Sequence, residues 1–231
     1  MENNHKHCAT QSSTDHNHAC GSMKEEIIAH FPYAVFSVAL GLIGVALLDY
    51  LSSGAKTPQL IKGGMHTLFH TFHFMHIVFA ATGGMLTFFR YSNQLIKGII
   101  ICSVSTVVFC IASDILVPYI VGTMFGVPMK LHICFLSELH NVLPFLLIGT
   151  INGWILAQHE KHLHSFYSLW SHFTHIFVSS SAAILYTVSH GFTNWANHMG
   201  VIFLCLVIAV VIPCTLSDVV IPFFFSKDHK C

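Results

Sequence analysis

Histidine pairs recur in this sequence at a spacing that suits metal binding. His73 and His76 are matched 99 residues later by His172 and His175, in the related segments HFMHI and HFTHI. Two residues at positions i and i+3 project from the same side of a helix. Because imidazole nitrogens bind divalent transition metals, each pair is a candidate for half of a metal site.

Acidic residues recur in the same order as the histidines. Asp114 is matched 104 residues later by Asp218, and Glu26 is matched 112 residues later by Glu138. Depths estimated from hydropathy predict one His/His/Asp/Glu cluster toward each face of a membrane. The predicted outer metal site is His73, His76, Asp114 and Glu138, and the predicted inner site is His172, His175, Asp218 and Glu26.

These donor sets indicate which metals would bind. Four nitrogen and oxygen ligands suit tetrahedral Zn²⁺, whereas Fe²⁺, Mn²⁺, Co²⁺ or Ni²⁺ would add waters. Cys110 and Cys214 lie four residues before the repeated aspartates, on the same helix face, and would favour Zn²⁺ or Cd²⁺. Further histidines extend the series as second-rank ligands: His66, His70, His140 and His30, with His132 and His190 also near the predicted outer end.

The first residues of the chain form a separate chelating segment. Residues 1–24 are polar, low in complexity and expected to be disordered. Within residues 5–20 they carry the candidate ligands His5, His7, Cys8, His16, His18 and Cys20. Cysteine beside histidine in a flexible tail suits a reducing compartment and a soft or borderline metal.

The elements that carry these residues are transmembrane helices. Apolar residues make up 54% of the chain and charged residues only 9%, where a soluble chain has about 25% charged residues. The formal net charge of zero argues against a nucleic-acid partner. Apolar segments near the roughly 20 residues of a spanning helix predict six spans: 25–48, 66–89, 97–121, 131–156, 166–190 and 199–225.

The matching motifs divide the chain into two repeats of three spans each. Residues 25–121 form the first predicted repeat, residues 131–225 the second, and 226–231 a short cytoplasmic tail. An odd number of spans forces the second repeat to insert upside down relative to the first. The sequence therefore predicts an all-α polytopic membrane protein with two inverted three-helix repeats, an architecture of many secondary transporters.

The distribution of Lys and Arg predicts the orientation. Seven of these residues lie on the side of the two termini and three on the opposite side. By the positive-inside rule, both termini are expected to be cytoplasmic, in the cell (inner) membrane.

The favoured function is transport of a divalent transition metal, with Zn²⁺ as the expected substrate. No phosphate-cradling GxxxxGK segment is present, so transport would use ion gradients or protons. The cytoplasmic chelating tail favours efflux, because it would concentrate metal at the entry side. A transporter is preferred to an enzyme. A b-type haem protein and a di-iron desaturase or hydroxylase remain the alternatives, and a homodimer stays open.

Overall fold

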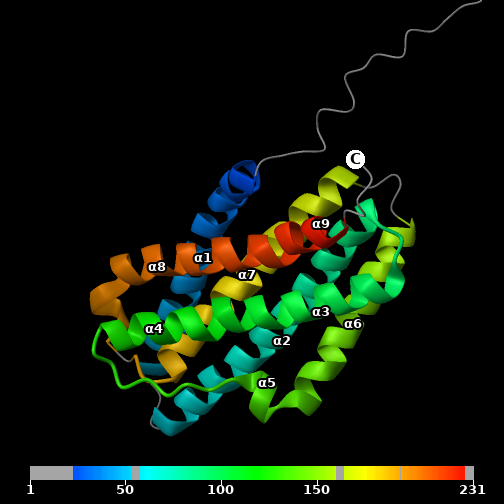
Figure 1. Cartoon of the computed structure of the whole chain (residues 1–231). Coiled ribbons are helices and arrows are strands. Elements are labelled where there is room, and N and C mark those ends of the chain that lie inside the picture. The colour runs from blue at the N-terminus through cyan, green and yellow to red at the C-terminus, as the bar shows by residue number, and fades with distance from the viewer. Residues whose placement is uncertain (1–22, 54–57, 160–163, 193, 227–231) are drawn as a thin grey trace, which may run out of the picture.

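The computed structural model describes residues 23–53, 58–159, 164–192 and 194–226. In these ranges the chain is helical and contains no β-strand (Figure 1). Five helical stretches within them are long and apolar enough to cross a membrane: Phe31–Leu51, Gly63–Tyr91, Leu95–Met124, Leu139–Gln158 and Trp195–Ser226. The prediction of an all-α membrane protein is confirmed at this level.

The helices follow the order of the predicted spans. The first three rods are α1 (Met23–Ser53), α2 (Pro58–Tyr91), and α3 (Leu95–Ile111) continued by η2 (Ala112–Leu116) and α4 (Val117–Met124). The short α5 (Cys134–Ser137) precedes α6 (Leu139–His159) and α7 (His164–Ser189). A last rod contains η3 (Trp195–His198), α8 (Met199–Thr215), η4 (Leu216–Val220) and α9 (Ile221–Ser226).

Helices α2 and α7 pack against each other in opposite directions at the centre of the bundle. Phe69, early in α2, lies 5.2 Å from Tyr186, late in α7, measured between ring centroids. Further along α2, Phe72 lies 6.4 Å from Phe177. The rods α3–α4 and α8–α9 also lie side by side and run in opposite directions, since α3 contacts α9 and α4 contacts α8 (Figure 1).

Glycines let the outer helices approach this central pair. A Cβ on Gly41 of α1 would lie 2.7 Å from Ile184 of α7. A Cβ on Gly153 of α6 would lie 2.6 Å from Met85 of α2. Side chains at these positions would therefore push the helices apart, which is the usual reason for small residues at membrane helix interfaces.

Both helices that carry the repeated aspartates contain one π-helical turn. Asp114 lies in η2 and Asp218 in η4, and each is followed four residues later by a proline, Pro118 or Pro222. Proline has no N–H and its ring clashes with the carbonyl four residues earlier, so a regular α-turn cannot continue there. The chain instead makes wider turns, with Val117 N–H donating to the carbonyl of Ala112.

The predicted span 131–156 differs from the observed element. Within its first part only Cys134–Ser137 are helical, as the separate short helix α5, and Glu138 has backbone angles φ −132° and ψ 38° that are not helical. Its carbonyl accepts the N–H of Val142 and so begins α6. A carboxylate is favoured at a helix N-terminus by the macrodipole, which explains why the long helix starts after Glu138.

Candidate metal centre

Asp114 joins α2 to the π-turn η2. Its Oδ2 accepts hydrogen bonds from Nδ1 of His73 at 2.8 Å and Nδ1 of His76 at 2.7 Å. Its Oδ1 accepts the hydroxyls of Ser113 at 2.7 Å and Ser179 at 2.9 Å. All five residues are buried, and Asp114 is 0% exposed. The carboxylate is therefore saturated by donors from three elements, α2, η2 and α7.

His175 and Asp218 form the corresponding pair in the other half of the chain. Nδ1 of His175 bonds to Oδ2 of Asp218, and both residues are buried. His172, one turn earlier on α7, is half-buried. The second predicted His/Asp pairing is thus present, carried by α7 and η4.

The two histidine–aspartate units meet at one point. Nε2 of His76 lies 2.8 Å from Nε2 of His175, although these residues are 99 positions apart. The thiol of Cys214 lies 3.6 Å from the same Nε2 of His76, and that of Cys110 lies 3.8 Å from it. The repeated motifs predict two clusters at opposite faces, but in the structure the two histidine–aspartate units lie together in one buried centre.

Three of these side chains are arranged as a metal-binding set. The ligand atoms of His76, His175 and Cys214 all lie within 4.8 Å of one another. Both histidines use Nδ1 on a carboxylate, which leaves Nε2 to face the shared space. A carboxylate on the far nitrogen of a metal-binding histidine is a common outer-shell arrangement that fixes the tautomer and ring orientation.

Glu138 lies elsewhere than predicted. Its Oε1 is 3.1 Å from Nε2 of His70 and 3.7 Å from Nε2 of His132. It thus joins the N-terminal half of α2 and the segment before α5, instead of the Asp114 cluster. Burial alone would raise the pKa of Glu138, but the hydrogen bond from Asn141 and the neighbouring histidines, His70 first among them, lower it overall.

The remaining predicted ligands fall into two groups. His66 lies beside His70 and is exposed, and His140 is exposed on α6. The side chains of Glu26 and His30 lie outside the described residues. So do those of the N-terminal candidates His5, His7, Cys8, His16, His18 and Cys20.

Two serines were not predicted as part of any site, whereas His132 belongs to the predicted outer series of histidines. Ser113 and Ser179 donate to Asp114, and His132 contacts His70. The repeated Ser-Asp dipeptides, Ser113-Asp114 and Ser217-Asp218, were a usable signal for the first serine. Nothing local marked Ser179, because its role depends on how α7 packs against η2.

Comparison of the chain with protein families, with curated proteins and with solved structures found no match.

Proposed function

We propose that this protein transports a divalent transition metal, with Zn²⁺ the favoured substrate, through the buried centre of His76, His175 and Cys214. The observation that carries the proposal is the convergence of two Nε2 atoms and one thiol within 4.8 Å inside a bundle of membrane-type helices. Buried ionisable residues in such helices are costly in lipid and usually mark an ion path.

The donor chemistry supports Zn²⁺. Two imidazoles and one thiol suit a borderline metal, and three protein ligands leave a coordination position for an exchanging ligand. In tetrahedral Zn²⁺ sites, nitrogen and sulfur ligands lie roughly 3.5 Å apart. The separation between Cys214 Sγ and His76 Nε2 is 3.6 Å, which agrees with that geometry.

The two Nε2 atoms are too close for a metal between them as they stand. At 2.8 Å they are at hydrogen-bond distance, whereas nitrogen ligands of tetrahedral Zn²⁺ lie roughly 3.3–3.4 Å apart. Metal binding must therefore open the pair slightly and release the proton that it shares. Exchange of metal for protons is the coupling that this arrangement favours.

We also propose that six spans form two inverted repeats, with α7 as the remaining span. Matching contacts support this architecture. His76 touches His175, its own counterpart in the repeat, as expected for residues on a pseudo-twofold axis. The contact of Gly41 with Ile184 is matched by that of Gly153 with Met85, residue for residue at the repeat offsets.

An inverted repeat would explain why the proposed site lies at the contact between His76 and His175. In transporters built from inverted repeats, the substrate site lies where the repeats meet, and the two halves open it alternately to each side. The axis between His76 and His175 is that meeting point here. The haem alternative finds no support at this pair, because the touching rings leave no room for a porphyrin between them.

A flux assay tests the proposal. The full chain is reconstituted in liposomes with a metal-sensitive dye and a pH dye, and supplied with Zn²⁺, Cd²⁺, Mn²⁺ or Fe²⁺. We expect saturable Zn²⁺ flux with an opposing pH change. His175→Ala should reduce flux to that of empty liposomes, and Cys214→Ser should lower it about tenfold, more for Zn²⁺ and Cd²⁺ than for Mn²⁺.

The control is His140→Ala, which removes an exposed histidine outside the centre and should leave flux within about twofold of the wild type. Flux of His175→Ala equal to that of the wild type would overturn the proposal. So would a wild-type protein that carries none of the four metals.

Efflux from the cytoplasm is the direction we propose, with both termini on the cytoplasmic side. Residues 1–22 would concentrate metal at the entry, so their deletion should weaken the apparent affinity for cytoplasmic metal and leave the maximal rate near normal. An importer gated by this segment would instead become overactive and load cells with metal. Whole-cell metal content after deletion distinguishes the two directions.

A further inference from the structure

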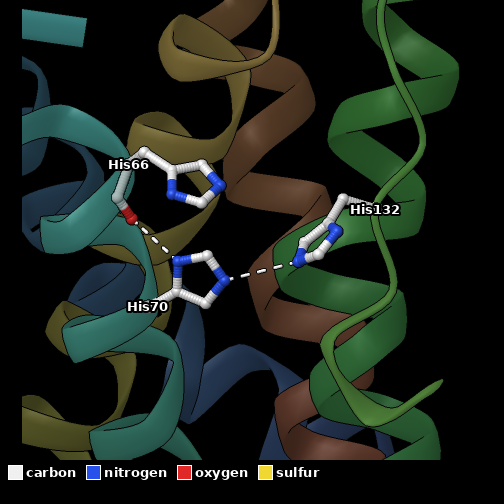
Figure 2. Close-up of side chains that lie close together, drawn as sticks. All are labelled: His66, His70 and His132. Atoms are coloured by element: carbon white, nitrogen blue, oxygen red, sulfur yellow. Dashed lines mark hydrogen bonds between the residues drawn. The ribbon is translucent and has the colours of Figure 1, made fainter. Parts of the chain in front are cut away.

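A second cluster of histidines lies at the end of the bundle where α2 begins. His66 and His70 come from the N-terminal half of α2, and His132 comes from the segment between α4 and α5 (Figure 2). One ligand nitrogen from each lies within 4.8 Å of the other two. Oε1 of Glu138 adds a carboxylate oxygen 3.1 Å from Nε2 of His70.

The distances within this cluster match those between metal ligands. Nε2 of His70 and Nε2 of His132 are 3.4 Å apart. Nitrogen ligands about 2.0–2.1 Å from a tetrahedral Zn²⁺ lie roughly 3.3–3.4 Å from each other. The distances from Glu138 Oε1 to these nitrogens, 3.1 and 3.7 Å, bracket the same value. A cation could therefore enter among His70, His132 and Glu138 with little movement of these side chains, and the ligand nitrogen of His66 lies within 4.8 Å of those of the other two histidines.

The far side of the His70 ring is fixed by a backbone group. Nδ1 of His70 donates to the carbonyl oxygen of His66 at 2.9 Å, as the dashed line in Figure 2 shows. A carbonyl oxygen only accepts, so Nδ1 carries the proton and Nε2 of the neutral ring offers its lone pair. Metal-binding histidines commonly use a backbone carbonyl in this way.

Tyr186 of α7 holds the segment that carries His132. Its hydroxyl accepts the backbone N–H of His132 at 3.2 Å and donates to the carbonyl of Lys130 at 3.1 Å. The Tyr186 side chain is fully buried. His132 is thus positioned by a buried side chain of α7 although it lies in a loop, and the cluster has supporting contacts on two of its three histidines.

The cluster is open at one end and closed at the other. His66 is exposed, so ions can reach the cluster from the solvent at this end. Toward the buried centre, the ring of Phe69 stacks on that of His73, 5.6 Å between centroids, and also contacts Tyr186. The fully buried Phe69 separates the exposed cluster from the Asp114 unit.

We propose that His66, His70, His132 and Glu138 form a second site for divalent metals of the Zn²⁺ type, one that exchanges ions between the solvent and the buried centre. Its assignment as an exchange site rests on the proposed transport function, whereas metal binding by the cluster does not. With efflux, this end faces outward and the cluster receives ions that leave the centre.

The test counts bound metal on the full chain. Wild-type protein and variants in detergent are equilibrated with Zn²⁺, washed, and assayed for metal per chain, so that the N-terminal ligands contribute equally to every sample. The variants are His70→Gln combined with His132→Gln for the exposed cluster, Cys214→Ser for the buried centre, and His198→Gln as the control. His198 is an exposed histidine outside the cluster.

We expect the His70/His132 double variant to lose about one metal per chain, and His198→Gln to lose none. A double variant that binds as much Zn²⁺ as the wild type would overturn the proposal. Tyr186→Phe keeps all ligands but removes both hydroxyl contacts, and should weaken Zn²⁺ binding at the cluster about tenfold. Unchanged affinity in Tyr186→Phe would contradict the positioning role given to Tyr186.

The outcome also separates this proposal from the proposed function. If the protein does not transport metal but the double variant loses one Zn²⁺, the exposed site stands and transport falls. If Cys214→Ser loses metal and flux while the double variant keeps both, transport stands and the exposed site falls. In a transporter with both sites, the double variant should keep metal at the buried centre yet lower the flux.

Discussion

Each half of the buried centre pairs histidine with aspartate, but the two carboxylates differ in the number of hydrogen bonds that they accept. Asp114 accepts four hydrogen bonds, from two histidines and two serines. Asp218 bonds His175 through Oδ2, but its Oδ1 is buried with no hydrogen-bond partner among the described residues. Both oxygens of Asp114 therefore accept hydrogen bonds, whereas one oxygen of Asp218 remains an unused acceptor.

One substitution between the repeats accounts for part of the difference. Ser179 of α7, which donates to Asp114, corresponds to Ala80 of α2, which has no hydroxyl to offer Asp218. Gly83 of α2 lies so close to Asp218 that a Cβ would be 2.8 Å from its Oδ2, whereas the corresponding residue of α7 is Ala182. Matching sequence motifs thus carry two different polar environments.

Removal of each carboxylate should separate its contribution to stability from its contribution to transport. Asp114→Asn replaces one carboxylate oxygen with an NH₂ group, so that two of the four buried donors lose their acceptor, and should lower the free energy of unfolding by about 3 kcal/mol. Asp218→Asn should cost about 1 kcal/mol, because fewer donors lose a partner. Thermal unfolding in detergent measures the difference, and both variants should lose most Zn²⁺ flux. Equal losses of stability would refute the contrast.

The close approach at Gly83 offers a more local test. Gly83→Ala would place a methyl group against the Asp218 carboxylate and turn it away from His175, so we expect flux to fall about tenfold while the protein still folds. Gly44→Ala is the matched control, because nothing lies within 4 Å of its Cβ position, and it should behave as the wild type. Proteoliposome flux and gel filtration together check both outcomes.

The smallest expected effects come from exchanging the hydroxyl between the halves. Ser179→Ala removes one donor to Asp114 and should lower the free energy of unfolding by about 0.5–1 kcal/mol. Ala80→Ser would offer the missing donor to Asp218 and should raise it by a similar amount. Unfolding in detergent decides between them, and a destabilised Ala80→Ser variant would mean that the α2 position does not face Asp218.

Much of the helical fold could be predicted from the sequence, with residues 131–138 as an exception. Hydropathy located α2 and the longer helical segments α3–α4 and α8–α9, since membrane burial is set by apolar length. It failed for residues 131–138, which are apolar enough to join α6 but end in the helix break at Glu138. Hydropathy reports how apolar a segment is and does not report where its hydrogen-bond ladder starts.

The sequence predicted which residues lie close together better than it predicted how their side chains are arranged. Repeat spacing correctly grouped His73 and His76 with Asp114, and His175 with Asp218. It assigned the aspartates as direct ligands, whereas their oxygens bond to Nδ1 of the histidines and leave Nε2 for the shared space. Spacing along a helix gives the face of a residue, but not which nitrogen of a ring its neighbour will meet.

The sequence alone determined that this chain is a bundle of apolar helices with histidine and aspartate at repeated positions, because helix length and side-chain periodicity are local properties. Only the tertiary structure decided that His76 meets His175, that Cys214 joins them, and that Glu138 pairs with His70. Those contacts depend on the antiparallel packing of α2 and α7 and on the π-turns that set the direction of each aspartate. Lateral packing and helix rotation arise between segments far apart in the chain, so no local pattern encodes them.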